Sequence, residues 1–155
     1  MQCTIYAQGE LAKKRFVEKG QVLVLARWED GLILSRDEIN ALWTLPQGEK
    51  DRGESGEETA RRALGSAIGE AVFDVSPLCD FTVTDEAGKE SGGCAYLADV
   101  REWPAREGAK ARAFVRMPLG SQTAQAALVF GLHRWAGVFF DERLDLEQLG
   151  SPSSR

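Results

Sequence analysis

Apolar residues recur with the spacing of β-strands near the start of the chain. Cys3, Ile5 and Ala7 alternate with polar residues, and a period of two predicts a short strand with one buried face. Residues 22–28 and 32–34 are rich in apolar and β-branched side chains, and an Asp-Gly pair stands between them. Because Asp-Gly is a frequent hairpin turn, these two segments predict a β-hairpin.

Later segments continue this pattern. Residues 42–46 form a short apolar piece that ends at a proline, and residues 47–53 are predicted to be a loop of glycine and charge. Further strands are predicted over residues 72–84, which Pro77 should interrupt, over residues 94–100 after a polar turn, and over residues 112–117.

Residues 55–68 have the composition and the end signals of a helix. Ser55 is a candidate N-cap, and Glu57 and Glu58 place negative charge in the first turn. Gly69 follows the segment as a C-terminal stop signal. The segment is therefore predicted to form a capped helix.

A second helix is predicted over residues 121–139, so the order along the chain is strands, helix, strands, helix. This order predicts an α+β domain in which helices pack on a sheet. A length of 155 residues is that of one domain. We expect this domain to span residues 1–150 and to be followed by a flexible polar tail, residues 151–155.

Charge and composition narrow the classes of function. A formal net charge of −5 argues against binding of bulk nucleic acid, because phosphate backbones attract a basic surface. No apolar run approaches the roughly 20 residues that cross a membrane, so no membrane association is expected. Three dispersed cysteines and one histidine do not predict a zinc site. The cysteine usage is typical of a reducing cytoplasm.

The loop and helix of residues 47–69 raise the question of phosphate chemistry. Hydrolysis of a phosphoanhydride uses a divalent metal, and a helix can hold one with carboxylates at positions i, i+3 and i+4, which share a face. The only acids within residues 55–68 are Glu57 and Glu58, which are adjacent and point in different directions. The face of Ala63, Ser66 and Ala67 carries no acid. Residue chemistry alone predicts no assembled metal site.

The same segment resembles the Nudix box of the MutT-type hydrolases. That box consists of glycine, five residues, glutamate, seven residues, Arg-Glu, an aliphatic residue, any residue, Glu-Glu, any residue, glycine and an aliphatic residue. Matching residues stand at five of these places: Gly48, Glu54, Arg62, Leu64 and Gly69. The resemblance implies the Nudix fold, an α/β/α sandwich with a mixed β-sheet packed between helices.

The departures from the box fall on its acids. Ala63 stands for the glutamate that follows the arginine, and Ser66 and Ala67 stand for the paired glutamates, which in the family hold magnesium. The resemblance implies hydrolysis, with magnesium or manganese, of a nucleoside diphosphate linked to another moiety, such as an oxidised nucleoside triphosphate. The three replacements imply that this activity is weak or absent. The alternative is a non-catalytic or regulatory domain that binds a nucleotide or metabolite, with no metal bound.

Several residues remain candidates for the site. Glu54 and Arg62 are remnants of the catalytic pattern. Glu54 is a candidate metal ligand, and the alternative is a structural ion pair with Arg62 that orients the loop on the helix. Gly48 is a candidate for substrate binding, and Trp43 and Phe81 could stack on a base or pack in the core.

Other residues could supply chemistry from outside the box. Relocated acids are a third hypothesis, with candidates Glu49, Asp51, Glu54, Glu102 and Glu107. His133 could be a general base or a packing residue. A phosphate could be bound without metal near Arg62, Arg112 or Arg116. The substrate and the oligomeric state stay open, and a homodimer is one alternative.

Overall fold

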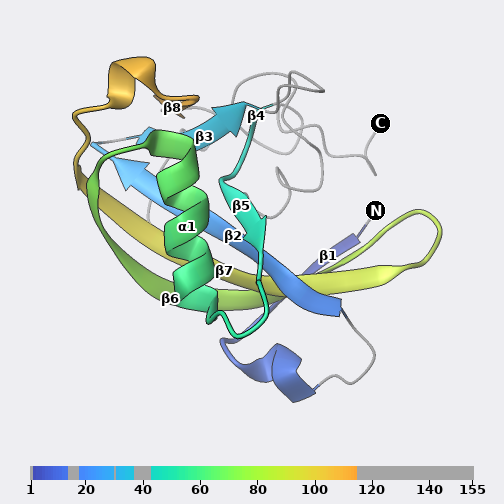
Figure 1. The fold of residues 1–155 in the computed structure, drawn as a ribbon. Coiled ribbons are helices and arrows are strands. Elements are labelled where there is room, and N and C mark those ends of the chain that lie inside the picture. Colours follow the sequence, from blue (N-terminus) through green and yellow to red (C-terminus); the bar gives the residue numbers. More distant parts are fainter. Residues whose placement is uncertain (1, 14–17, 30, 37–42, 115–155) are drawn as a thin grey trace.

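The computed structural model describes residues 2–13, 18–29, 31–36 and 43–114, and these residues form one β-sheet with one α-helix packed on it (Figure 1). The elements, in chain order, are β1 (Gln2–Tyr6), the 3-10 helix η1 (Glu10–Lys13), β2 (Glu18–Trp28), β3 (Gly31–Arg36), β4 (Trp43–Thr44), β5 (Gln47–Glu49), α1 (Gly56–Ile68), β6 (Val72–Thr84), β7 (Glu90–Glu102), the 3-10 helix η2 (Arg106–Gly108) and β8 (Ala111–Phe114).

The sheet is mixed. The main path of hydrogen-bonded neighbours is β1-β6-β7-β2-β3-β4, while β5 pairs with β2 and β8 pairs with β3. Strands β2 and β7 run parallel, and the other described pairs run antiparallel. The predicted hairpin is confirmed, because β2 and β3 pair antiparallel with Trp28 opposite Gly31.

Two local predictions need correction. Strand β6 continues through Pro77, and the proline causes only a shift of register against β7 between Pro77 and Cys79. A proline has no backbone N–H to donate to the neighbouring strand. A bulge accommodates this missing hydrogen bond without ending the strand. The predicted loop of residues 47–53 begins with β5, whose Gly48 lies opposite Val22 of β2. Pairing with a distant strand overrides the turn-like composition of this segment.

Helix α1 begins and ends where the sequence predicts. Ser55 is its N-cap, and Ser55 and Glu58 form a reciprocal capping box, with each side chain accepting from the other residue's backbone N–H at 3.0–3.1 Å. Gly69 ends the helix with a φ of 75°, and its N–H donates to the carbonyl of Gly65. A positive φ favours glycine at this position.

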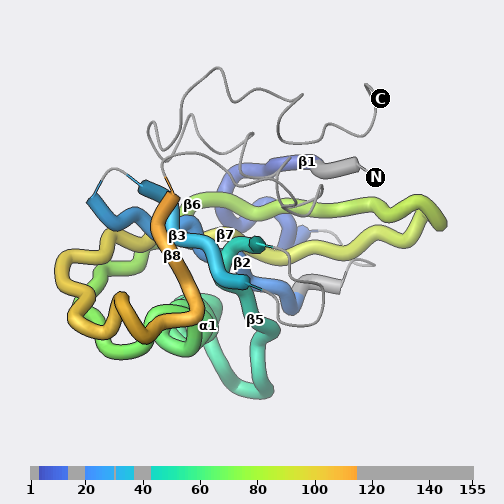
Figure 2. The backbone as a smooth tube through the Cα atoms, turned by 90° about the horizontal axis from the view of Figure 1, so that it is seen from above, coloured from blue at the N-terminus to red at the C-terminus, as the bar shows by residue number. Residues whose placement is uncertain are grey.

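Strand β2 separates two apolar cores because its side chains alternate between the faces of the sheet. Val22 and Val24 pack towards α1 together with Leu64, whereas Leu23 and Leu25 belong to the core on the opposite face. Figure 2 shows α1 lying on one side of the strands, with β1 on the far side. The helix therefore presents one side to the core and leaves another side for the loop and for a cavity.

Some expectations fall outside the described residues. These are the second predicted helix, residues 121–139, the part of the last predicted strand beyond Phe114, and the tail. No helix within the described part of the chain is long and apolar enough to cross a membrane.

Candidate functional site

An ion pair between Arg62 and Glu54, the clasp, joins the loop after β5 to helix α1. The Nε atom of Arg62 donates to Glu54 Oε2 and its Nη2 atom donates to Glu54 Oε1, both at 2.9 Å. Nη2 also donates to the backbone carbonyl of Glu49 at 2.7 Å. A two-pronged contact uses the planar guanidinium fully. The structure thus contains the ion pair that is the alternative to a metal-ligand role for Glu54.

The Glu54 carboxylate accepts four hydrogen bonds, three at Oε1 and one at Oε2. Besides the two donors of Arg62, it accepts the Thr59 hydroxyl at 2.8 Å and the Asp51 backbone N–H at 2.9 Å. These donors hold the pKa of Glu54 at about 2, well below its ordinary value of 4.5, and Arg62 is the largest cause. In return, Glu54 raises the pKa of Arg62. Since a carboxylate offers about four acceptor positions, Glu54 has little capacity left for a metal.

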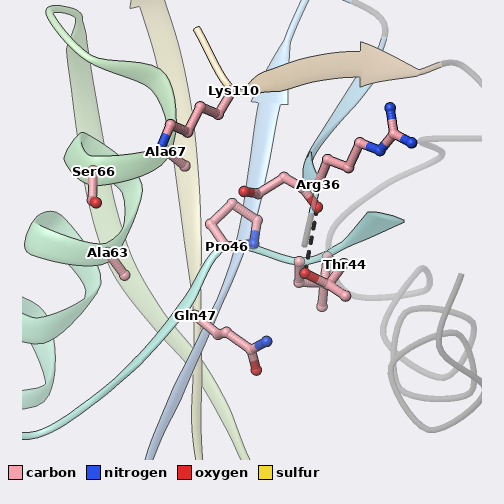
Figure 3. Close-up of a pocket in the computed structure, with 10 residues that line it drawn as sticks. Arg36, Thr44, Pro46, Gln47, Ala63, Ser66, Ala67 and Lys110 are labelled. Carbon is pink, nitrogen blue, oxygen red and sulfur yellow. Dashed lines mark hydrogen bonds between the residues drawn. The ribbon is translucent and has the colours of Figure 1, made fainter. Parts of the chain in front are cut away.

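A cavity of about 290 Å³ lies between α1 and the strands β3 and β4 (Figure 3). Its floor is the acid-free face of the helix, because Ala63, Ser66 and Ala67 share one side of α1 at the spacing i, i+3 and i+4. Opposite the helix, the hydroxyl of Thr44 donates to the carbonyl of Ser35 at 3.4 Å. The residues that line the cavity are Ser35, Arg36, Thr44, Leu45, Pro46, Gln47, Ala63, Ser66, Ala67 and Lys110.

Among the described residues that line this cavity there are two cations, Arg36 and Lys110, and no carboxylate. Lys110 reaches from the start of β8 across to the helix, and its side chain ends near Ala67 (Figure 3). Arg36 extends in the opposite direction, with its guanidinium pointing away from α1 (Figure 3). Of the two described cations in the lining, the ammonium of Lys110 is therefore the one that faces the helix.

Comparison with known proteins shows which fold this is. No protein-family model matches the sequence, and no curated protein matches it. Among solved structures, the pyrophosphohydrolase BsRppH of Bacillus subtilis matches with a TM-score of 0.54 and 19% identity, over 96% of this chain and 90% of that chain. A MutT Nudix hydrolase of Burkholderia pseudomallei matches with a TM-score of 0.54 and 18% identity, over 71% of this chain and 94% of the other. The chain has the Nudix fold.

A third similar structure is that of NrtR of Shewanella oneidensis. It matches with a TM-score of 0.52 and 18% identity, over 83% of this chain and 73% of that chain. NrtR has also been crystallised with a 27mer DNA. At these identities the likeness establishes the fold, and function must be argued from the site.

The described residues around the cavity do not offer the ligands of a divalent metal, the kind of cofactor that Nudix hydrolases use. Magnesium prefers several oxygen ligands, chiefly carboxylates and water, whereas the helix face offers two methyl groups and the Ser66 hydroxyl. The ammonium of Lys110 would repel a dication at the same place. In the described part of the chain, no group of three or more histidine, cysteine or acidic residues could hold a metal.

The acids of the relocation hypothesis do not meet at the cavity. Asp51 is exposed, with Oδ2 3.6 Å from Arg62 Nη2. Glu49 lines a separate cavity of about 460 Å³ with Asp85. Glu102 and Glu107 are exposed at the end of β7 and in η2. None of these four residues lines the cavity beside α1.

The aromatic and glycine candidates have structural positions. Phe81 is fully buried in the core on the face opposite α1, so its ring offers no face to a base. Trp43 is half-buried against that core, in edge contact with Phe114 at a centroid distance of 4.9 Å. Gly48 packs over α1, where an added Cβ would lie 3.5 Å from the Cβ of Ala63. These contacts correspond to the packing alternatives.

The basic residues proposed as phosphate ligands are not brought together at the cavity by the described part of the structure. Arg62 is engaged by the clasp, and Arg112 lies opposite Leu34 in the β3–β8 pair. Because paired residues point to the same face and Leu34 belongs to the core away from α1, Arg112 faces away from the cavity. Arg116 and His133 lie outside the described residues.

Sequence reasoning missed Lys110 and Arg36. Lys110 is brought to the cavity by the pairing of β8 with β3, in which Ala111 lies opposite Ser35. The Arg36 N–H donates to the Lys110 carbonyl at 3.4 Å. No local pattern marks these two residues, because the pairing of distant strands places them.

Proposed function

We propose that this chain is a Nudix-fold binding domain for a nucleotide or a nucleotide-derived small molecule, with metal-dependent hydrolysis weak or absent. The observation that carries the proposal is the composition of the cavity beside α1. Its helical floor is Ala63, Ser66 and Ala67, and none of the described residues that line it is a carboxylate. A pocket with this lining is suited to an anionic ligand and poorly suited to a metal-activated water.

The size of the expected loss can be estimated. One preorganised group that stabilises developing charge contributes roughly 10²- to 10³-fold to kcat, and a catalytic metal adds the acidification of water. Replacement of three such positions at once removes both contributions. The Nudix fold supports the hydrolase hypothesis, and the cavity lining supports binding without turnover.

The clasp argues against a metal site rebuilt around Glu54. Its carboxylate oxygens receive four hydrogen bonds from Arg62, Thr59 and Asp51. A metal would have to displace at least one of these donors and then compete with the adjacent guanidinium. We therefore assign Glu54 and Arg62 to positioning of the loop.

The test is turnover of a panel of nucleotides with magnesium and with manganese. The panel includes normal and oxidised nucleoside triphosphates, ADP-ribose and dinucleoside polyphosphates. The native chain is compared with a variant that carries Ala63→Glu, Ser66→Glu and Ala67→Glu. Because Lys110 would pair with the new glutamates, a fourth change, Lys110→Ala, is added in a second variant, and Lys110→Ala alone is the matched control.

We expect the native chain and the Lys110→Ala control to be inactive and the four-fold variant to gain turnover. The same variant should bind manganese in a calorimetric titration, which reports the metal site independently of substrate choice. Circular dichroism checks that the variants fold. Native turnover at an ordinary enzymatic rate, about 1 s⁻¹ or faster, would contradict the proposal.

A further inference from the structure

We propose that the ammonium of Lys110 takes the place of a divalent metal, so that the cavity beside α1 holds a phosphate or diphosphate group without any metal. This inference rests on the proposed function and names the chemistry of its ligand. A primary ammonium carries three donors and a full positive charge. It can therefore neutralise and hydrogen-bond phosphate oxygens that a metal would otherwise bridge.

The sheet determines where this charge lies. Lys110 directly precedes β8, and the pairing of Ala111 with Ser35 sets β8 against β3. The hydrogen bond from the Arg36 N–H to the Lys110 carbonyl, at 3.4 Å, holds the backbone at the end of this ladder. From there the side chain crosses to α1 beside Ala67 (Figure 3). A short Ala67 side chain leaves room that a glutamate would occupy.

The remaining lining suits an anion. Ser66 adds a hydroxyl that can donate, and the lining residues that the structure describes include no carboxylate. The side-chain carbonyl of Gln47 accepts from Gln21 Nε2 at 3.1 Å. The NH₂ group of the Gln47 side chain is therefore the end that can donate to a ligand. In the described part of its lining, the pocket thus combines an ammonium with neutral donors, a set that attracts phosphate.

The size of the cavity limits the ligand. Its volume of about 290 Å³ is near the lower end for small-molecule pockets, roughly 300 Å³. This volume suits the diphosphate portion of a nucleotide and leaves the base and sugar outside. Pyrophosphate is therefore the simplest probe of the site, and a nucleoside diphosphate is the next.

A purely structural role for Lys110 makes a different prediction. Helix α1 has no basic residue in its last turn, and a cation near a helix C-terminus is stabilising. Two late carbonyls already have donors, since Gly65 accepts from the Gly69 N–H at 2.9 Å and Ile68 accepts from Trp103 Nε1 at 2.8 Å. A structural role predicts that loss of Lys110 lowers the melting temperature and leaves ligand binding unaltered.

The experiment is calorimetric titration of the full chain with pyrophosphate and with ADP, in EDTA and then in magnesium. The variants are Lys110→Gln, which removes the charge, and Lys110→Arg, which keeps it. Lys13→Gln removes a lysine charge from η1, at the other end of the molecule (Figure 1).

We expect binding in EDTA that Lys110→Gln weakens about tenfold to a hundredfold, the range for a hydrogen bond to a charged group. Lys110→Arg should retain most of the affinity, and Lys13→Gln should change it less than about threefold. Melting curves confirm that each variant folds.

Three results would overturn the inference: no binding in EDTA, equal binding by Lys110→Gln and the native chain, or an equal loss in Lys13→Gln. Binding that appears only with magnesium overturns it but leaves the proposed function intact. Native hydrolysis with magnesium overturns the proposed function, and the titration in EDTA still reports on Lys110.

Discussion

Arg62 and Glu54 meet through two hydrogen bonds of 2.9 Å, which join the loop after β5 to helix α1. The same guanidinium holds the carbonyl of Glu49 at 2.7 Å, so one arginine fixes both ends of the loop. In this chain the contacts of these two residues are with each other, with the loop and, for Glu54, with Thr59 of α1.

The clasp should contribute to stability. Glu54→Gln removes the charge of the carboxylate and leaves Arg62, Thr59 and the Asp51 N–H with a weaker acceptor. We expect a lower midpoint of urea unfolding than that of the native chain. A matched control is Glu57→Gln, which breaks an exposed i,i+4 pair with Arg61 at 3.2 Å and should change the free energy of unfolding by about 0.5 kcal/mol or less. Equal effects of the two substitutions would contradict a special role for Glu54.

The clasp also predicts a dependence of stability on pH. The pKa of Glu54 is about 2 in the folded chain against an ordinary value of 4.5, so the unfolded chain binds more protons at intermediate pH. The contribution of Glu54 is present in full above about pH 4.5 and is lost as the pH falls towards about 2. The difference in melting temperature between the native chain and Glu54→Gln should therefore be constant above pH 4.5 and shrink below it. A difference that does not vary with pH would contradict the lowered pKa.

Two glycines should respond to alanine in opposite ways. Gly93 of β7 lies opposite Gln21 of β2, and an added Cβ would overlap the carbonyl oxygen of Gln21. Because the obstacle is backbone in a buried strand pair, we expect Gly93→Ala to lower the free energy of unfolding by about 1–3 kcal/mol or more. Gly65 of α1 has open space around the Cβ position, so Gly65→Ala should raise it by up to about 1 kcal/mol. Urea titrations measure both, and stabilisation by Gly93→Ala would show that β2 and β7 are not paired in this register.

The end of α1 beside the cavity depends on Trp103. The indole Nε1 donates to the Ile68 carbonyl at 2.8 Å in a buried environment, and the ring packs edge-on to Trp28 at a centroid distance of 5.9 Å. Trp103→Phe keeps an aromatic ring but leaves that carbonyl without its donor, so we expect a loss of about 1–3 kcal/mol in unfolding free energy. A change below about 0.5 kcal/mol in chemical denaturation would show that another donor replaces the indole.

Much of the fold follows from local pattern. The β2–β3 hairpin and the bounds of α1 were predictable because the signals involved are close in sequence: an Asp-Gly turn for the first, and Ser55, Glu58 and Gly69 for the second. The strand β5 and the continuity of β6 through Pro77 were not predictable in this way. Both depend on a partner strand that supplies hydrogen bonds from elsewhere in the chain.

The sequence by itself determined the capped helix, the absence of acids on the face of Ala63, Ser66 and Ala67, and the spacing of Glu54 and Arg62. These properties depend on neighbours within a few turns, which helix geometry relates directly. Only the tertiary structure decided that Lys110 faces that helix and that Arg112 and Phe81 do not. The physical reason is that the register of β8 on β3, and of β6 on its neighbours, sets which side chains from distant segments share a face.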